Sequence, residues 1–198
     1  MKDTRLELLT KAEALVRSRG YSGFSYADLA LAVGVRTASI HYYFPAKKDL
    51  GVALVAFYDE RYDAEMAGIL RSTDDGLERV TAYARLYLSG LEQKLGCLCA
   101  VLAITPEFLP TEIRDAVRRF FRKHFLWLKT VLEEGRANGS IRKDIDCDQQ
   151  ARVAIALLEG ALLMEPMLDG SSGFMSAIAA LQSQLRPASK GDQSPKEA

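Results

Sequence analysis

Apolar residues recur at spacings of three and four along most of the chain, and no stretch alternates apolar and polar residues as a half-buried strand would. Nine segments carry such a stripe or lie between clear caps and breaks, over about residues 3–19, 26–33, 37–43, 46–71, 77–95, 97–104, 111–138, 148–165 and 174–185. The pattern therefore predicts an all-α fold of about nine helices.

The two short segments 26–33 and 37–43 have the spacing of a helix-turn-helix. Ala30 is small, so the second helix can pass close to the first, and Gly34 suits the positive φ with which the chain must leave the first helix. The apolar residues that would wedge the two helices at a steep angle are Leu29, Val33, Val35 and Ile40. The pattern predicts a helix-turn-helix, and an ordinary helical hairpin inside a core is the alternative.

Side chains suited to DNA contact gather on the second of these helices and beside it. Ser25 and Thr37 are expected to cap the two helices. In a recognition helix the N-terminal residues enter the major groove, so we expect Thr37 and Tyr42 to contact bases and Ala38 to meet a thymine methyl. The remaining polar and basic side chains are expected to hold phosphates. The predicted DNA-binding residues are Ser25, Arg36, Thr37, Ala38, Ser39, His41, Tyr42, Tyr43 and Lys47.

Residues 6–50 resemble the DNA-binding domain of the TetR family of bacterial one-component regulators. The resemblance rests on RGYSGFSYADLALAVGV and SIHYYFPAKKDL, and above all on YYFPAKKDL, which is similar to the family signature Tyr-x-x-Phe-x-x-Lys-x-x-Leu. Ala38 stands where the family usually has glycine, a departure that concerns base preference rather than fold. Only about the first quarter of the chain carries the sequence resemblance, and the rest matches the family in length and helical layout.

Three regions follow from the pattern and the resemblance. Residues 1–48 are expected to form the DNA-binding domain, 49–186 a helical ligand-binding and dimerisation domain, and the polar, proline-bearing 187–198 a disordered tail. The helix over 46–71 would belong to both domains and act as a rigid lever between them.

The last two predicted helices are candidates for a dimer interface. Segment 148–165 is apolar on nearly all sides, unlike a helix with one face in water. We expect it to pair, together with 174–185, with the same helices of a second chain in a four-helix, two-fold interface, as the resemblance also implies. A monomer that buries both helices in its own core is the alternative.

Charge and composition support a DNA-binding protein of the cytoplasm. The net charge is zero, but residues 1–50 hold eight Lys and Arg against five Asp and Glu, and the remaining 148 residues hold 18 against 21. A basic head on an acidic body suits a protein that brings one end to DNA. The chain has no visible signal peptide, no apolar run of membrane-spanning length and an odd number of cysteines, so we expect a cytoplasmic protein without a membrane partner.

The resemblance implies a small-molecule site among the middle helices. Side chains with apolar bodies and a few polar tips that could line it are Tyr62, Met66, Tyr83, Tyr87, Phe108, Phe121, His124, Trp127 and Met164. A plain core role is the alternative for each of them. His124 lies on an apolar stripe between Phe121 and Leu128, where it is either a core histidine bonded to a neighbour or a group that orients a ligand.

Cys97 is expected just before a helix N-terminus, where the helix dipole favours a reactive thiolate. The surrounding segment resembles, over a short stretch, family members that sense electrophiles or oxidants through a cysteine. The alternative is a small buried apolar residue. Cys97 and Cys99 point apart on a helix and lack a zinc-knuckle spacing, so neither a disulfide between them nor a metal or other cofactor is expected.

Together these features predict a homodimeric transcriptional regulator, most simply a repressor that leaves its palindromic operator when a small-molecule inducer binds. Oxidation or alkylation of Cys97 is the alternative trigger. An enzyme is not expected, because the chain has two histidines and no Gly-x-Ser-x-Gly elbow, phosphate-binding glycine loop or metal-ligand cluster. A helical interaction module that does not bind DNA is the alternative of another class.

Overall fold

The structure, a computed structural model, describes residues 3–187. In this range the chain forms ten α-helices and three short 3-10 helices and no strand. The elements are α1 (Thr4–Arg19), η1 (Tyr21–Gly23), α2 (Tyr26–Val33), α3 (Thr37–Tyr43), α4 (Lys47–Ser72), α5 (Gly76–Arg85), α6 (Leu88–Glu92), α7 (Leu98–Ala103), η2 (Pro106–Phe108), α8 (Thr111–Asn138), α9 (Cys147–Met164), η3 (Glu165–Met167) and α10 (Ser171–Leu185). The predicted all-α fold class is confirmed, and the tail expected over 187–198 lies outside the described residues except for its first residue, Pro187.

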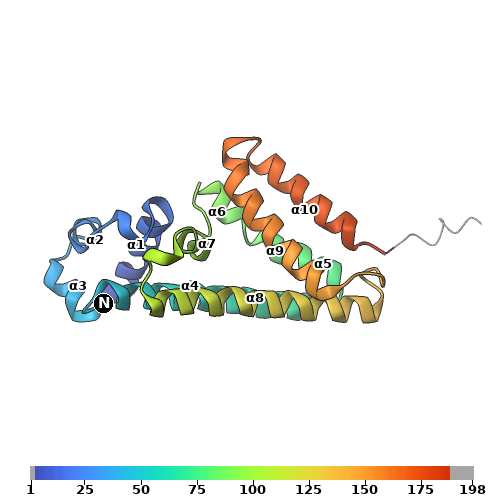
Figure 1. Cartoon of the computed structure of the whole chain (residues 1–198), viewed down its shortest axis with the longest axis horizontal. Helices are drawn as coiled ribbons and strands as arrows, with labels where there is room; N and C mark the ends of the chain where they lie inside the picture. The colour runs from blue at the N-terminus through green and yellow to red at the C-terminus, as the bar shows by residue number, and fades with distance from the viewer. Residues whose placement is uncertain (1–2, 188–198) are drawn as a thin grey trace, which may run out of the picture. The chain divides into compact units, whose positions relative to one another are not determined.

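The helices gather into two compact units (Figure 1). Unit 1 comprises Met1–Ala67 and Ser89–His124, and unit 2 comprises Gly68–Leu88 and Phe125–Ala198. Helices α4 and α8 each have residues in both units.

Two predicted helix boundaries are wrong. The helix expected over 77–95 ends at Arg85, because the N–H groups of Leu86 and Tyr87 donate to carbonyls three residues back and tighten the chain into a turn before α6. The helix expected over 174–185 begins earlier, at Ser171, so Ser171, Ser172 and Gly173 belong to the first turn of α10. Gly170, with φ of 59°, makes the preceding turn, and the fully buried Phe174 anchors the helix start.

Unit 1 is built on α1, which contacts α2, η1 and α7. Asp3 caps α1, accepting hydrogen bonds from the backbone N–H groups of Arg5 and Leu6. The side chains of α1 that enter the core are Leu8, Leu9, Ala12 and Val16. Leu6, although apolar, is 47% exposed, because the packed face of α1 is rotated toward Leu8.

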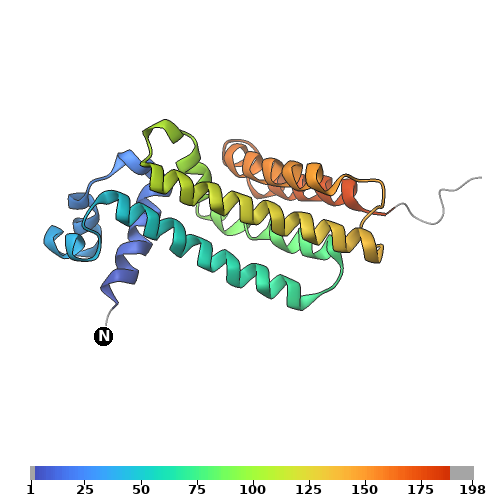
Figure 2. The same cartoon turned by 60° about the horizontal axis from the view of Figure 1, so that its bottom comes forward.

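The predicted helix-turn-helix is present as α2 and α3, with the bounds expected (Figure 2). Ser25 and Asp28 form a capping box at the start of α2, and Gly34 adopts the left-handed conformation with φ of 78°. Leu29 and Ile40 are fully buried where the two helices meet. Thr37 was expected to cap α3, but it is the first helical residue, and the preceding position provides no side-chain cap.

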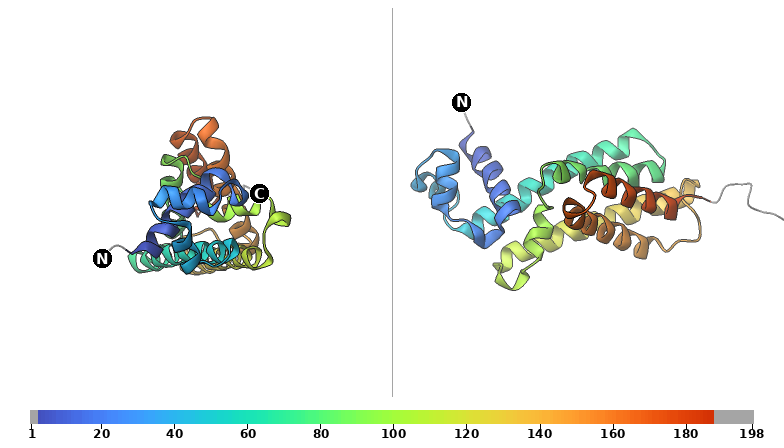
Figure 3. Two further views of the ribbon diagram at one scale, coloured as in Figure 1. Left: turned by 90° about the vertical axis from the view of Figure 1, so that its left-hand side faces the viewer. Right: turned by 90° about the horizontal axis from the view of Figure 1, so that it is seen from above.

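Unit 2 packs α10 against α9 and α5 (Figure 3). The buried side chains of α10 are Phe174, Ile178, Leu181 and Leu185. Helices α5 and α8 approach so closely that a Cβ on Gly76 would lie 2.6 Å from the Cα of Gly135. The buried Arg79 guanidinium donates to the carbonyl oxygens of Leu70 and Thr73 and to Glu134, which fixes the turn between α4 and α5. Within residues 3–187, no helix combines the length and apolar character that a membrane span requires.

Candidate functional sites

Helix α3 presents the predicted DNA-contacting side chains together on its outer side. Arg36, Thr37, Ala38 and His41 are exposed, and Ser39 is half-buried. Tyr42 is 81% exposed, so its ring remains largely in water, and Tyr43 is 37% exposed. Only Ile40 turns fully into the core. A seven-residue helix that buries one side chain and exposes two tyrosines is better suited to contacting a partner than to filling a core.

The position of α3 is fixed by hydrogen bonds at its C-terminal end. The Tyr26 hydroxyl donates to the carbonyl oxygen of Phe44 at 2.9 Å. The Nδ1 atom of His41 lies 3.1 Å from the carbonyl oxygen of Pro45, and its ring lies edge-on to the ring of Tyr26 at 4.8 Å between centroids. These contacts, all within one chain, orient α3 without a bound partner.

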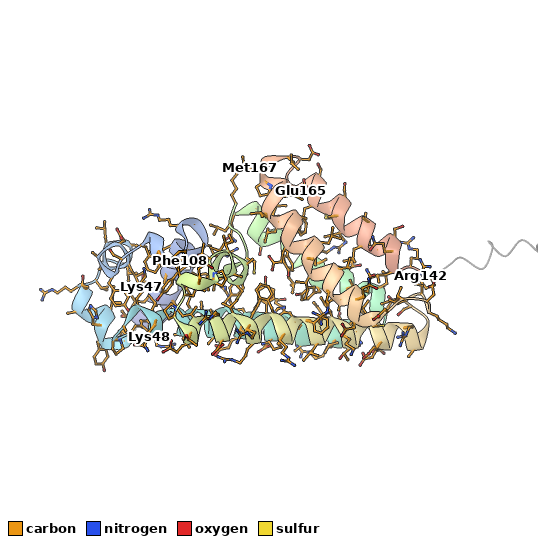
Figure 4. All side chains as sticks on the ribbon, viewed as in Figure 1. Lys47, Lys48, Phe108, Arg142, Glu165 and Met167 are labelled. Carbon is orange, nitrogen blue, oxygen red and sulfur yellow. The ribbon has the colours of Figure 1, made fainter. Side chains whose placement is uncertain are left out.

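The two lysines that open α4 have different surroundings (Figure 4). The Lys47 ammonium donates to the carbonyl oxygen of Phe24 and lies 4.2 Å from the centroid of the Phe24 ring and 4.9 Å from that of Tyr21. Partial burial lowers the pKa of Lys47. Lys48 is exposed and paired with Glu112 at 2.6 Å, which raises the pKa of Lys48. Lys47 therefore supports the helix-turn-helix from within, and a phosphate contact by it stays a prediction.

In unit 1, two of the candidate ligand-binding residues lie side by side. The His124 ring is 1% exposed and lies 5.1 Å from the ring of Tyr62, with Phe120 at 4.0 Å on another side. Its Nε2 atom is 3.9 Å from Oδ1 of Asp59, too far for a hydrogen bond, and the Lys123 ammonium binds that same oxygen at 2.6 Å. Burial lowers the pKa of His124 to about 4, so the imidazole is neutral near pH 7.

The other candidates of unit 1 do not join this pair in one surface. Met66 is buried and Phe121 is half-buried. Phe108, in η2, is 72% exposed.

In unit 2, three candidate residues meet with a fourth that the sequence analysis did not single out. The Tyr83 and Tyr87 hydroxyls are 3.4 Å apart, and the Tyr87 hydroxyl donates to Glu159 at 3.4 Å. The ring of Trp127 stacks on that of Tyr83 at 5.3 Å. The buried indole Nε1 of Trp127 has no hydrogen-bond partner among the described residues. We call Tyr83, Tyr87, Trp127 and Glu159 the indole cluster.

An apolar face is exposed along α9, on η3 and on α10. Its side chains, each at least 40% exposed, are Val153, Leu163, Met164, Met167, Leu168 and Met175. We call it the α9–α10 face. Met164, a candidate ligand-binding residue, is 55% exposed and belongs to this face. The stripe of α10 that contains Phe174 and Ile178 packs within unit 2, and the pairing of α9 and α10 with a second chain stays a prediction.

Cys97 is the N-cap residue of α7, as the sequence pattern predicted. Its side chain is 3% exposed, and Cys97, Cys99 and Cys147 are all reduced and buried. Among the described residues, no three His, Cys, Asp or Glu side chains are arranged to hold a metal ion.

Sequence reasoning missed two contacts that shape these sites. Arg17, on α1, donates from Nε to the carbonyl oxygen of Gly96 at 2.7 Å and from Nη2 to that of Leu95 at 3.2 Å. No local pattern could have found this contact, because 78 and 79 residues separate the partners. Glu159 did carry a signal, since a carboxylate in the middle of an apolar helix needs a partner.

Comparison with known proteins agrees with both parts of the chain. Residues 8–54 match a family model described as bacterial regulatory proteins of the tetR family, and residues 76–181 match one described as the tetracyclin repressor-like C-terminal domain. The HTH-type transcriptional repressor NemR of Escherichia coli strain K12 is 29% identical over 181 residues, which cover 89% of this chain and 91% of NemR.

Two solved structures show the same fold over nearly the whole chain. A TetR-family transcriptional regulator from Agrobacterium tumefaciens is 31% identical, with a TM-score of 0.87, over 92% of this chain and 97% of that one. The reduced form of E. coli NemR is 28% identical, with a TM-score of 0.84, over 95% of this chain and 100% of that one.

Proposed function

The chain belongs to the TetR family of bacterial regulatory proteins, and on this premise we propose that it is a homodimeric repressor released from a palindromic operator by a small-molecule inducer. It would act in the cytoplasm, with residues 1–48 as its DNA-binding domain and 49–186 as its ligand-binding and dimerisation domain. The name of its relative NemR, a transcriptional repressor, supports repression rather than activation.

The observation that carries the DNA-binding role is the exposure of α3. Two aromatic rings and the start of a helix face outward from a helix-turn-helix whose turn, cap and C-terminal hydrogen bonds are all formed. We propose that Thr37 and Tyr42 contact bases, that Ala38 meets a thymine methyl, and that the neighbouring polar side chains hold phosphates.

Footprinting on the DNA flanking the gene and its neighbours tests this role. We expect protection of a palindromic sequence and a steep fall of affinity with salt, because neutralised phosphates release counterions. A helical interaction module that does not bind DNA would protect no site and show no such salt dependence.

The α9–α10 face supports the dimer. Large apolar side chains exposed together on one face usually mark an interface, and a second copy of the chain offers the same face in a two-fold arrangement.

The indole cluster supports the inducer site. A buried indole N–H without a partner is costly, and a bound molecule with a carbonyl or hydroxyl oxygen would accept its hydrogen bond. The cluster also supplies aromatic faces and a carboxylate, which suit a planar molecule with at least one polar group.

Intrinsic fluorescence tests the inducer site directly, because Trp127 is the one tryptophan in the sequence. Candidate inducers that release the operator should change its emission, and Trp127→Phe should weaken their effect on operator release. An inducer whose potency is unchanged in Trp127→Phe would place the site elsewhere.

Oxidation or alkylation of Cys97 is the second candidate trigger. It is supported by the position of Cys97 directly after Gly96, whose carbonyl oxygen is bonded to Arg17 of α1, so a change at the thiol would reach the first helix of unit 1. The relative NemR has a structure described as a reduced form. If Cys97→Ser still releases the operator normally with the inducer and with hydrogen peroxide, the result supports the small-molecule trigger and contradicts the thiol trigger.

A further inference from the structure

A groove in unit 1 belongs neither to the helix-turn-helix surface nor to the indole cluster. It lies between the last turn of α1 with η1 on one side and α7 with η2 on the other, and its volume is about 430 Å³. That volume is within the range of small-molecule sites, about 300 to 1,000 Å³.

One wall of the groove is apolar and unusually exposed. Ile104 is 67% exposed and Phe108 is 72% exposed, and Val101 and Tyr21 are half-buried beside them. Figure 4 shows Phe108 on η2. Two large apolar side chains left in water along one groove wall favour a partner that covers them.

The charge of the groove is positive. Arg17 and Arg19 are among its lining residues, and none of the lining residues is Asp or Glu. Arg17 is neutralised by Glu13 at 3.1 Å and is held by the carbonyl oxygens of Leu95 and Gly96. The exposed guanidinium of Arg19 forms no hydrogen bond and no ion pair within hydrogen-bond distance with any residue that the structure describes, and its charge also helps to lower the pKa of Asp28, which does not line the groove. A ligand in the groove can therefore still form a direct contact with Arg19.

The wall that carries Arg19 is closely packed. Gly20, with φ of 76°, reverses the chain after α1. A Cβ on Gly23 would lie 2.9 Å from the Cβ of Arg19, so η1 folds directly against the end of α1. The ring of Tyr21 is in turn in contact with the Lys47 ammonium.

We propose that this groove binds a small amphipathic monoanion, with its carboxylate on Arg19 and its apolar body against Ile104 and Phe108. The positive charge of Arg19 in a lining that contains no carboxylate selects the anion, and the exposed apolar wall selects the body. Such a ligand would touch α1 and α7 at once, beside the Arg17 contact with Gly96. The binding itself does not depend on the proposed function, and it would hold for a chain that bound no DNA.

Calorimetric titration of the full-length protein with octanoate tests the proposal, with 1-octanol as the neutral probe of the same length. We expect saturable binding of octanoate, and binding about tenfold weaker for octanol and for Arg19→Gln, since each loses a charge-assisted hydrogen bond. Phe108→Ala should also weaken octanoate binding. The matched controls Arg118→Gln and Leu126→Ala change exposed residues outside the groove and should bind as the original chain does.

Photocrosslinking with a diazirine analogue of octanoate locates the site. Labelled peptides should cover residues 17–23 or 101–109. The proposal is overturned if octanoate does not bind saturably, if the Arg19 and Arg118 variants lose affinity equally, or if the label falls only on other segments, such as that containing Trp127. Loss of operator binding in any variant would bear on the proposed function. It would not change the conclusion drawn from the octanoate titration.

Discussion

Arg17 Nε lies 2.7 Å from the carbonyl oxygen of Gly96, across 79 residues of sequence, and joins α1 to the segment that leads into α7. The same guanidinium reaches the carbonyl oxygen of Leu95 and the buried carboxylate of Glu13, which Arg61 also contacts. The Arg17 side chain is 11% exposed, so these bonds form largely out of water. A single residue therefore connects the first helix of the chain to the loop beside Cys97 within unit 1.

Arg17→Gln should destabilise the protein by about 2 to 4 kcal/mol, because two carbonyl oxygens lose their donor and Glu13 loses one of its cations. Urea unfolding followed by circular dichroism measures the difference. Arg118→Gln is the matched control, since that arginine is exposed and, among the described residues, pairs only with Asp115 at 2.6 Å. The unfolding midpoint of this variant should not move. Equal midpoints for both variants would show that the Arg17 bonds contribute nothing.

Two glycine-to-alanine variants should change stability in opposite directions. Gly76→Ala places a Cβ 2.6 Å from the Cα of Gly135. A backbone atom cannot rotate away as a side chain can, so we expect the free energy of unfolding to fall by about 1 to 3 kcal/mol. Gly68→Ala, in the last part of α4, meets nothing nearer than the end of the Arg71 side chain at 4.0 Å. It should stabilise the protein by up to about 1 kcal/mol through helix propensity. Thermal unfolding of both variants provides the test, and a Gly76→Ala protein as stable as the original chain would contradict the close approach of α5 and α8.

The parts of the fold that the sequence predicted are those with local causes. The helix-turn-helix follows from the Ser25 cap, the left-handed Gly34 and the small Ala30, all within ten residues, and α2 and α3 begin and end where expected. The helix break at Leu86 and Tyr87 contains no glycine or proline that would have indicated it in the sequence. Tertiary packing determines where such a helix ends, so the break cannot be predicted from the local sequence pattern.

The same limit applies to the candidate sites. Lys47 and Lys48 are adjacent and alike in sequence, and only the folded chain places the first against the Phe24 carbonyl oxygen and leaves the second in water. The exposure of α3 could be predicted from the sequence, because this helix contains few apolar residues. The indole cluster did not follow, because Tyr83 and Trp127 meet across 44 positions and Glu159 joins them from a third helix.

His124 should make stability depend on pH. The unfolded chain binds a proton at this residue below about pH 6.5, whereas burial keeps the folded imidazole neutral down to about pH 4. Stability therefore falls as the pH is lowered from about 6.5 to about 4, by roughly 3 kcal/mol from this residue. His124→Gln removes this dependence while the nearby Asp59, Asp63 and Lys123 remain. The difference in unfolding free energy between the two proteins, measured at several pH values from 7 to 4, should shrink in this window. A constant difference would mean that the folded histidine keeps its ordinary pKa.

Tyr42→Ala should weaken operator binding without affecting the fold. The side chain is 81% exposed, and its ring touches only that of Tyr43 among the ring contacts of the described residues, so its loss costs little stability. Loss of one good base contact should lower affinity about tenfold. Fluorescence anisotropy with the footprinted operator measures the change. Leu126→Ala, exposed on α8, is the control and should bind as tightly as the original chain. Unchanged affinity in Tyr42→Ala would remove this residue from the interface.

Leu163→Asp should convert the dimer to a monomer. Leu163 is 70% exposed in the single chain, and Met164 and Met167, which follow it in the sequence, are exposed on the same α9–α10 face. In a two-fold interface a new carboxylate would be buried twice, once from each chain, without a partner, and such burial opposes association strongly. Sedimentation velocity at micromolar concentration should then give the 21.9 kDa of one chain. Leu126→Asp places the same charge at a leucine that is 50% exposed on α8, and it should remain dimeric. Because the side chain at position 163 is exposed within one chain, Leu163→Asp should keep its helical circular dichroism. A dimeric Leu163→Asp protein would mean that the two copies meet through another surface.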